Sequence, residues 1–465
     1  MTTTAQAQYA GPPLWNVAAE TLSGAELEAL HLEKLKSLLV RVYENSPYYR
    51  EAFDAAGVNP HEFASLEEYE RYPVFTKHDE RASQARSLAE DGHPLGKHIT
   101  CDIRKVNRMS ASSGTTGTPS FQGHTRNDRH IQAENMARLM KRIGIEPGDR
   151  ALYAGVMSMW VAGIPTIDCM MEYGLNVIPI GALVGSIKVA EMALLTNPRV
   201  ITGTPSFLRH MLKKAAEAGL DLTTCGIEKV LVYGEPGGSQ PAIVAELSKG
   251  FGGAEVYDLM GGTGCLNPIF TSCEAHDGFH FFAPDYAYVE VRDPETGHFL
   301  LIADGVEGEL IYTGLDRKCG PLIRFSDGDR VRITTAPCSC GRPGWRMRIL
   351  GRVDDMLLLK GVNVFPSAVQ DVALQFKPQL TGNIRILKYS DSPVIEPPMQ
   401  IWVECAGTPS QEVMDALAQK LSSEIQRRLR FNSVITPFAE GQMEMEHGAT
   451  GKAKLIRKMY GEDAK

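Results

Sequence analysis

The chain contains few cysteines, no excess of basic residues and no long apolar segment. Nine cysteines among 465 residues are too few for a fold held together by disulfides, and they favour a reduced cytoplasmic location. A net charge of −8 argues against a nucleic-acid-binding surface. The longest uncharged apolar segment, residues 151–167, is interrupted by glycine, serine and proline, whereas a membrane span needs roughly 20 predominantly apolar residues. Residues 1–15 show no basic segment followed by an apolar core, so no signal peptide is expected.

Internal repeats and low-complexity blocks are also absent, and short apolar runs instead alternate with amphipathic segments. Strands are expected at 151–157, 230–233 and 254–259, and a helix is expected at 127–143. This alternation is typical of an α/β fold in which helices flank buried sheets.

From about residue 278 the sequence becomes β-rich with tight turns, and residues 353–465 return to a mixed α/β character. Two adjacent aspartates, Asp354 and Asp355, interrupt an apolar context between these regions. We therefore expect a large domain over residues 1–352, with a β-rich subdomain, and a small α+β domain over residues 353–465.

A Walker-type phosphate loop is missing, although residues 110–120, SASSGTTGTPS, are rich in hydroxyls and glycines and carry no charge. Glycine allows the backbone to approach a ligand closely, and hydroxyls with free N–H groups can hold phosphate oxygens. Taken alone, this segment is equally consistent with a flexible linker.

The segment SSGTTGTP, residues 112–119, resembles the phosphate loop of the adenylate-forming superfamily, which includes acyl-CoA synthetases, peptide-synthetase adenylation domains and luciferases. More specifically, the chain resembles phenylacetate–CoA ligase-like enzymes along most of its length. Further matching segments, in order, are ETLSGAELEALHLEKLKSLLVRVYENSPYYREAF (20–53), YPVFTKHDER (72–81), VYGEPGG (232–238), GELIYTG (308–314), PLIRFSDGDRV (321–331) and GRVDDMLLLKGVNVFP (351–366).

The resemblance implies a large adenylate-forming domain, a mobile C-terminal domain and a reaction in two steps. A carboxylate attacks the α-phosphorus of MgATP to give an acyl-adenylate and pyrophosphate, and the thiol of coenzyme A then displaces AMP. Both steps depend on positioning of the reactants and on neutralisation of developing charge.

The family's phosphate contacts fall on a short run of this sequence. They are Ser113, Gly114, Thr115, Thr116 and Gly117, which would hold the β- and γ-phosphates. The cation that the loop lacks would come from the C-terminal segment GATGKAKLIRKM (448–459), where Lys452 matches the family's catalytic lysine and would neutralise charge that develops during adenylation. Lys454 is the alternative assignment, and a merely solvated basic segment is the other interpretation.

The resemblance also implies contacts with adenosine. Asp329 in RFSDGDRV would bind the ribose hydroxyls, with Arg352 near the same ribose or the phosphates, although SDGD is also typical of an Asp-Gly hairpin turn. Asp354 would be the hinge of the small domain. The adenine slot would be formed by Gly234, Glu235, Pro236, Tyr257, Asp258, Leu259 and Met260.

The sequence departs from the family pattern at the position of the Mg²⁺-binding glutamate, which is Gly261 here. Asp258, Glu235, threonine hydroxyls and water are the remaining oxygen donors. The acid pocket is expected to include Tyr153, Trp160, Gly261 and Gly262, because glycines leave room for a flat ring; plain core packing is the alternative for the Trp-bearing segment.

Three cysteines and a histidine form a candidate structural zinc site. Cys338 and Cys340 form a Cys-x-Cys pair, and Cys273 lies in TSCEAHDGFH. Three thiolates and one imidazole suit tetrahedral zinc and leave no position for a reacting water. His280 is the expected fourth ligand, with His276 as a rival; Cys319 and ordinary reduced cysteines are the other possibilities.

We therefore predict an ATP-dependent ligase that converts an aromatic or heteroaromatic carboxylic acid to its coenzyme A thioester, with ATP, Mg²⁺, coenzyme A and a structural Zn²⁺. Transfer to a carrier protein or an amine is one alternative. A non-catalytic nucleotide-binding relative, favoured by Gly261, is another. A homodimer is expected by analogy with the family alone.

Overall fold

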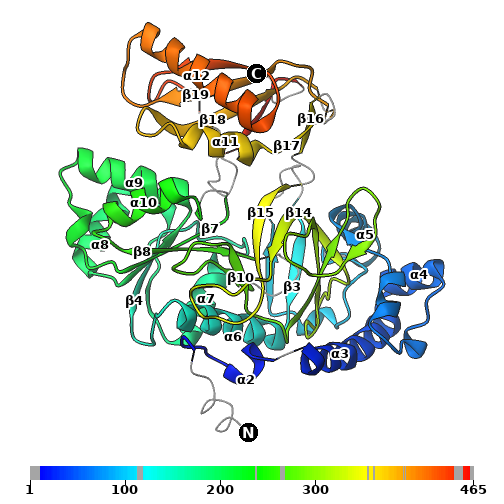
Figure 1. Cartoon of the computed structure of the whole chain (residues 1–465). Coiled ribbons are helices and arrows are strands. Elements are labelled where there is room, and N and C mark those ends of the chain that lie inside the picture. Colours follow the sequence, from blue (N-terminus) through cyan, green and yellow to red (C-terminus); the bar gives the residue numbers. More distant parts are fainter. Residues whose placement is uncertain are drawn as a thin grey trace.

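The computed structural model describes residues 11–22, 24–112, 119–235, 238–261, 268–352, 356–359, 362–390, 392, 394–444 and 454–460. Figure 1 shows a large body formed by the first three quarters of the chain and a smaller body formed by the C-terminal part. Among the described residues, no helix is long and apolar enough to cross a membrane.

A sheet of 13 strands runs through the large body, and one half of it is parallel. The parallel strands are β5 (Asn176–Ile178), β4 (Arg150–Tyr153), β6 (Val200–Gly203), β7 (Lys229–Tyr233) and β8 (Glu255–Met260), in that spatial order. The helices of this region are α6 (Arg126–Arg142), α7 (Ile164–Tyr173), α8 (Ser186–Thr196), α9 (Pro205–Glu217) and α10 (Pro241–Gly250). The predicted strands and helix are thus confirmed, and the first strand ends early, at Tyr153.

The other half of the sheet is mostly antiparallel and β-rich, as the sequence predicts. Its strands are β9 (Phe270–Thr271), β10 (Phe279–Phe281), β15 (Arg346–Arg352), β14 (Phe325–Thr334), β13 (Glu307–Gly314), β11 (Ala287–Arg292) and β12 (Phe299–Leu300). One large apolar core, which includes Tyr153, Phe270 and Phe325, extends under both halves, so the two halves pack as one unit.

The N-terminal segment covers the antiparallel half of the sheet. It contains α3 (Gly24–Asn45), α4 (Pro47–Ala56), β1 (Phe75–Thr76), α5 (Lys77–Asp91), β2 (Arg108–Ala111) and β3 (Phe121–His124). Strand β1 joins the main sheet beside β14, with Phe75 opposite Phe325, whereas β2 and β3 form a separate hairpin. A Thr76–Asp79 capping box starts α5 directly after β1, which fixes the helix beside that edge.

The smaller body has its own apolar core, which includes Leu359, Val369, Ile386, Ile401 and Leu421. A sheet in the order β20 (Ser433–Phe438), β19 (Met399–Cys405), β18 (Leu380–Lys388), β21 (Ile456–Lys458) packs with α11 (Pro366–Leu374) and α12 (Gln411–Leu429). The short strands β16 (Leu357–Leu359) and β17 (Val362–Val364) complete it. A separate core is what an independently moving unit requires.

Candidate functional site

The carboxyl ends of the parallel strands meet at one edge of the sheet, the edge where open α/β sheets bind ligands. Two carboxylates lie there: Glu235 follows β7, and Asp258 lies within β8. Glu235 accepts a hydrogen bond from the backbone N–H of Ser206 at 2.5 Å, and Asp258 accepts one from the Ser239 hydroxyl at 3.0 Å. Both acidic groups are thus held in place, Glu235 by the first turn of α9 and Asp258 by the segment before α10.

Asp258 carries an unusual carboxyl group. Burial raises its pKa to about 7, the hydrogen bond from Ser239 opposes the rise, and the charge of Glu235 adds to it. Gly238 packs directly against this carboxyl, because a side chain at position 238 would lie 2.6 Å from the Asp258 Cγ. The two acidic groups therefore lie close enough for the charge of Glu235 to act on Asp258.

The predicted acid pocket is only partly open. Tyr153 is fully buried at the end of β4, and its hydroxyl donates a hydrogen bond to the carbonyl of Ala162. Trp160 is half-buried and bridges to Ala111 at the end of β2, so the 155–163 loop lies directly beside the start of the hydroxyl-rich segment. Gly261 is half-buried just after β8.

Asp329 and Arg352 are brought together on adjacent strands, β14 and β15, where they occupy opposite positions in the register. The Arg352 Nη1 lies 3.2 Å from the Asp329 Oδ1. The Arg352 Nη2 also donates to the carbonyl of Asp327 at 2.8 Å. A guanidinium therefore fixes both the aspartate side chain and the backbone before it.

The SDGD segment forms a bulge within one strand and not a hairpin turn. Strand β13 pairs Ile311 with Ser326 and Glu309 with Arg330, so residues 327–329 stand opposite the single residue Leu310. Gly328 has φ +84°, which a glycine adopts without strain. Bulges re-aim side chains next to binding sites, and this one presents both Asp327 and Asp329 at the rim of the sheet.

The predicted adenine residues divide into two groups. Gly234 is exposed after β7, and Leu259 and Met260 are half-buried at the carboxyl end of β8. Tyr257 is only 3% exposed; its hydroxyl donates to Glu255, and the Lys229 ammonium lies 5.6 Å from its ring centre. Tyr257 therefore packs in the core, and its place in the adenine slot stays a prediction.

Several predicted residues lie outside the described part of the chain. They are Ser113, Gly114, Thr115, Thr116, Gly117, Pro236, Gly262, Asp354 and Lys452. The residues that flank the hydroxyl-rich segment are described: the Ser112 N–H donates to the Ser120 carbonyl at 2.9 Å, and the Ser120 N–H donates to the Ser112 hydroxyl at 3.3 Å. These bonds join Ser112 to Ser120, and this pair is the stem of the hydroxyl-rich segment.

The four predicted metal ligands converge on one point. Cys273, His280, Cys338 and Cys340 are all buried, and one donor atom from each lies within 4.8 Å of the other three. The Cys273 and Cys338 sulfurs are 3.7 Å apart, and the Cys340 sulfur is 3.4 Å from the His280 Nε2. Three thiols and an imidazole at this separation match the donor set of a structural zinc site.

The surroundings of this Cys₃His group favour a neutral histidine. Burial lowers the pKa of His280 to about 3, and the charges of Arg142, Arg346 and Arg342 add to the fall. A neutral imidazole is the form that binds a metal, and nearby guanidinium groups would balance the charge of three thiolates. Cys319, which packs against Gly123, is not a member of this group.

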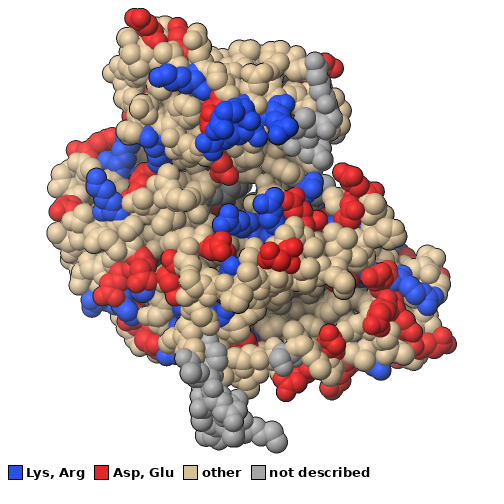
Figure 2. All heavy atoms as spheres, in the orientation of Figure 1, with Lys and Arg blue, Asp and Glu red and all other residues tan. Residues whose placement is uncertain are grey.

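The smaller body docks on α9 and α10 through polar contacts. Lys377 forms an ion pair with Glu246, Lys213 lies 2.5 Å from Glu440, and Arg209 donates to the carbonyl of Thr381 at 3.0 Å. Figure 2 shows a hollow between the two bodies with Lys and Arg side chains on both of its sides. Such a hollow would favour an anionic ligand.

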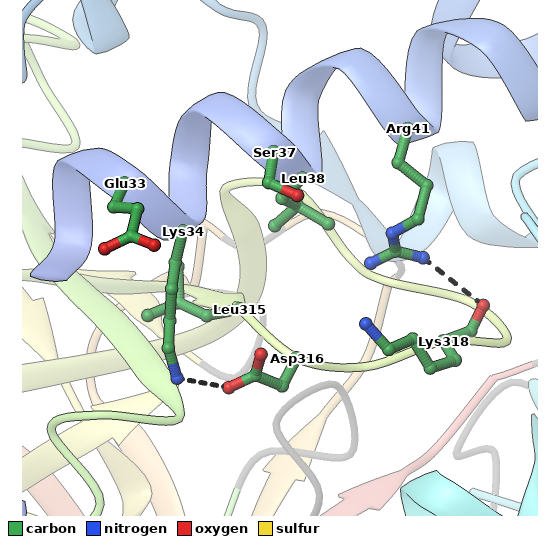
Figure 3. A pocket seen from close by; sticks show the side chains of 8 residues that line it. All are labelled: Glu33, Lys34, Ser37, Leu38, Arg41, Leu315, Asp316 and Lys318. Atoms are coloured by element: carbon green, nitrogen blue, oxygen red, sulfur yellow. Dashed lines mark hydrogen bonds and ion pairs between the residues drawn. The ribbon is translucent and has the colours of Figure 1, made fainter.

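A second cavity, of about 270 Å³, lies between α3 and the loop after β13, and Figure 3 shows its side chains. Two of its three cations are engaged: Lys34 pairs with Asp316, and Arg41 donates to the carbonyls of Arg317 and Lys318. The cavity does not include any of the predicted site residues.

Comparison with curated proteins places the chain in a family, although no family model matches it. It is 32% identical over 389 residues to a phenylacetate–coenzyme A ligase of Thermus thermophilus, covering 83% of each chain. It is 31% identical over 447 residues to a phenylacetate–coenzyme A ligase of Aromatoleum evansii, covering 94% of this chain and 95% of the relative.

Comparison with solved structures agrees with this placement. A 2-hydroxyisobutyryl-CoA ligase in the postadenylation state, in complex with 2-HIB-AMP, matches with a TM-score of 0.84 at 27% identity, over 96% of this chain and 93% of its own. In its thioesterification state with CoA, over 97% of this chain and 94% of its own, the TM-score is 0.69 at 26% identity. The chain therefore belongs to the phenylacetate–coenzyme A ligase family of adenylate-forming enzymes.

Proposed function

We propose that the protein is an AMP-forming acid–thiol ligase that activates an aromatic or heteroaromatic carboxylic acid and transfers the acyl group to coenzyme A. The observation that carries the proposal is the meeting of Asp329 and Arg352 on adjacent strands, in a chain similar to phenylacetate–coenzyme A ligases over most of its length. The family resemblance assigns Asp329 to the ribose and places Arg352 near the ribose or the phosphates.

In this proposal each group acts on a different part of the nucleotide. Asp329 accepts hydrogen bonds from the ribose hydroxyls, and Arg352 holds the Asp329 carboxylate in place. Residues 113–117 hold the β- and γ-phosphates, and Lys452 neutralises charge as the carboxylate attacks the α-phosphorus. Thiolysis by coenzyme A then follows after the smaller body, residues 353–465, moves about a hinge at Asp354.

Magnesium would be held by carboxylates other than the missing family glutamate. Gly261 offers only backbone oxygen, whereas Asp258 and Glu235 place two carboxylates at the same sheet edge. Carboxylate oxygens are among the ligands that Mg²⁺ prefers, so Asp258 and Glu235 are the residues that would hold it. When bound, Mg²⁺ would neutralise phosphate charge.

We further propose that Cys273, His280, Cys338 and Cys340 hold a structural Zn²⁺. The four buried donors fit the ion, and no ligand position is left for a reacting water. The ion would tie the segment after β9 to the turn between β14 and β15, which stabilises the strand that carries Asp329.

The function is tested by pyrophosphate release from ATP across a panel of aryl, arylacetic, heteroaryl and short aliphatic acids, with coenzyme A present and absent. We expect release that depends on an aromatic acid and a thioester product only with coenzyme A. Acid-dependent release without thioester would indicate a carrier protein or an amine as the acceptor. No release with any acid would contradict the proposal and favour a non-catalytic relative. A homodimer stays a prediction from the family resemblance.

Substitution of Asp329 should act on the ribose specifically. In Asp329→Asn, loss of charge-assisted hydrogen bonds should raise the KM for ATP about 10- to 100-fold, with the KM for the acid within about twofold. The preference for ATP over 2′-deoxy-ATP should shrink in parallel. Asp304→Asn is the matched control, because this exposed aspartate only accepts from backbone N–H groups at the far end of β14. Equal changes in both KM values would contradict the assignment.

A further inference from the structure

The segment YPVFTKHDER, residues 72–81, has no role in the site described above, yet the structure fixes it to the strand that carries Asp329. Phe75 and Thr76 extend the sheet beside β14. The buried Arg324 guanidinium also donates to the carbonyls of Tyr69, Glu70 and Tyr72. The start of α5 is therefore held rigidly beside the bulge at residues 327–329.

The first residue of α5 contacts the bulge itself. Lys77 forms an ion pair with Asp327, and the side chains of the two residues are only 30% and 12% exposed. The Tyr312 hydroxyl donates to the same carboxylate at 3.3 Å, while Arg352 donates to the Asp327 carbonyl. Asp327, two positions before Asp329, is thus held through its side chain by Lys77 and Tyr312 and through its backbone by Arg352.

Two turns further along, α5 contacts the stem of the hydroxyl-rich segment. The Gln84 Nε2 donates to the Phe121 carbonyl at 2.6 Å, and the Phe121 N–H donates to the Gln84 Oε1 at 3.1 Å. Gln84 is 6% exposed, so these two bonds are shielded from water. Phe121 follows Ser120, whose backbone closes the stem by pairing with Ser112.

Lys77, Glu80 and Gln84 are spaced i, i+3 and i+7, so they share one face of the helix. Glu80 is 1% exposed between the two contacts. Burial raises its pKa to about 7, a hydrogen bond with Ser120 opposes the rise, and the charge of Asp327 adds to it. One helical face thus reaches the loop stem at one end and the bulge at the other.

We infer that α5 sets the distance between the stem of the hydroxyl-rich segment and the ribose-binding bulge, with Lys77 and Gln84 as positioning residues. This inference rests on the proposed function, because it assigns phosphate to residues 113–117 and ribose to Asp329. Lys77 acts through Asp327 on the ribose end of the nucleotide. Gln84 acts through Phe121 on the phosphate end.

Effects on the ribose end and on the phosphate end of the nucleotide site can be distinguished by comparing the binding of ATP and AMP, because AMP lacks the β- and γ-phosphates. Binding of each nucleotide to the full-length protein would be measured by isothermal titration calorimetry. We expect Lys77→Met to weaken ATP and AMP alike, by about tenfold, and Lys77→Arg to restore both to within about threefold. Gln84→Leu should weaken ATP about tenfold and leave AMP within about twofold.

Two further variants keep the test decisive. Arg86→Met is the matched control, because Arg86 lies on the exposed face of α5 and pairs only with the surface residues Glu51 and Glu90; it should leave both affinities unchanged. Gln84→Met keeps the side-chain length and loses the hydrogen bonds to Phe121 without adding a charge, so it replaces Gln84→Leu should that variant unfold, and it should also weaken ATP selectively.

The outcomes distinguish this inference from the proposed function. If the unmodified protein binds neither ATP nor AMP, the proposed function is wrong. If it binds both, the positioning role of α5 is contradicted when Lys77→Met leaves both affinities unchanged. It is also contradicted when the folded Gln84 variant weakens the binding of ATP and AMP equally. A general loss of stability would lower the affinities for ATP and AMP together in both variants, which the positioning role of α5 does not predict.

Discussion

Lys452→Ala should lower the rate of acid-dependent adenylation about 10²- to 10³-fold, which is the scale measured when one preorganised group that stabilises transition-state charge is removed. The reason is that the hydroxyl-rich segment, residues 110–120, carries no cation of its own. A phosphate site built only from amides and hydroxyls needs an ammonium from elsewhere when the carboxylate attacks the α-phosphorus.

The same variant should make the thioester almost normally from a synthetic acyl-adenylate and coenzyme A, because the second step breaks the bond to AMP after the small domain has moved. The two partial reactions would be measured separately, as pyrophosphate exchange into ATP and as AMP release from the acyl-adenylate. Lys454→Ala is the matched control, since Lys454 is exposed and only two residues away. If Lys454→Ala shows the larger loss, Lys454 is the catalytic lysine; if neither variant loses exchange, the C-terminal segment does not supply the cation.

Loss of one ligand from the Cys₃His group should remove the metal and destabilise the fold strongly. The purified protein should contain about one equivalent of zinc, and Cys340→Ser should contain almost none. We expect the midpoint of thermal unfolding to fall by about 5–10 °C, because the two segments that carry the donors are no longer joined through a cation. Burial raises the pKa of Cys273 to about 12, with the neighbouring Cys340 and Cys338 adding to the rise, so this thiol ionises readily only beside a cation.

Cys225→Ser is the control for the substitution chemistry. The buried Cys225 thiol donates to the Leu222 carbonyl at 2.9 Å, and a serine hydroxyl can make the same bond. This variant should keep its zinc and most of its thermal stability. Unmodified protein purified without zinc, together with an unchanged unfolding midpoint in Cys340→Ser, would contradict the zinc proposal and leave four ordinary buried side chains.

Local patterns in the sequence predict much of the parallel half of the sheet. The apolar runs that become β7 and β8, and the helix that becomes α6, are predicted to within about two residues. Their periodicity is a local property that survives in any packing. The bulge at residues 327–329 is not predictable in this way, because it depends on register with β13, which the SDGD sequence does not specify.

The choice between His276 and His280 also depends on pairing between strands. Both histidines follow Cys273 closely in sequence, so spacing alone leaves both possible. Strand β10 places His280 opposite Thr271, two residues before Cys273, and this pairing brings its ring to the thiols. The burial of Tyr257 likewise depends on packing between elements, since the sequence alone does not show which face of β8 packs into the core.

Lys77 and Gln84 were missed as site residues for a related reason. Their segment matches the family, but Lys77 contacts a residue 250 positions later in the chain, and no local pattern reports such a contact. A cation at the start of a helix is, by sequence alone, more typical of a solvated surface. Only the pairing of β1 with β14 shows what the lysine reaches.

The most direct test of the central claim is to follow the carboxylate oxygen. An acid accepted by the enzyme would be labelled with ¹⁸O in its carboxylate and incubated with ATP, Mg²⁺ and coenzyme A, and the products would be analysed by mass spectrometry. Attack on the α-phosphorus predicts one labelled oxygen in AMP and none in pyrophosphate. Label in inorganic phosphate, or ADP as the nucleotide product, would contradict the account.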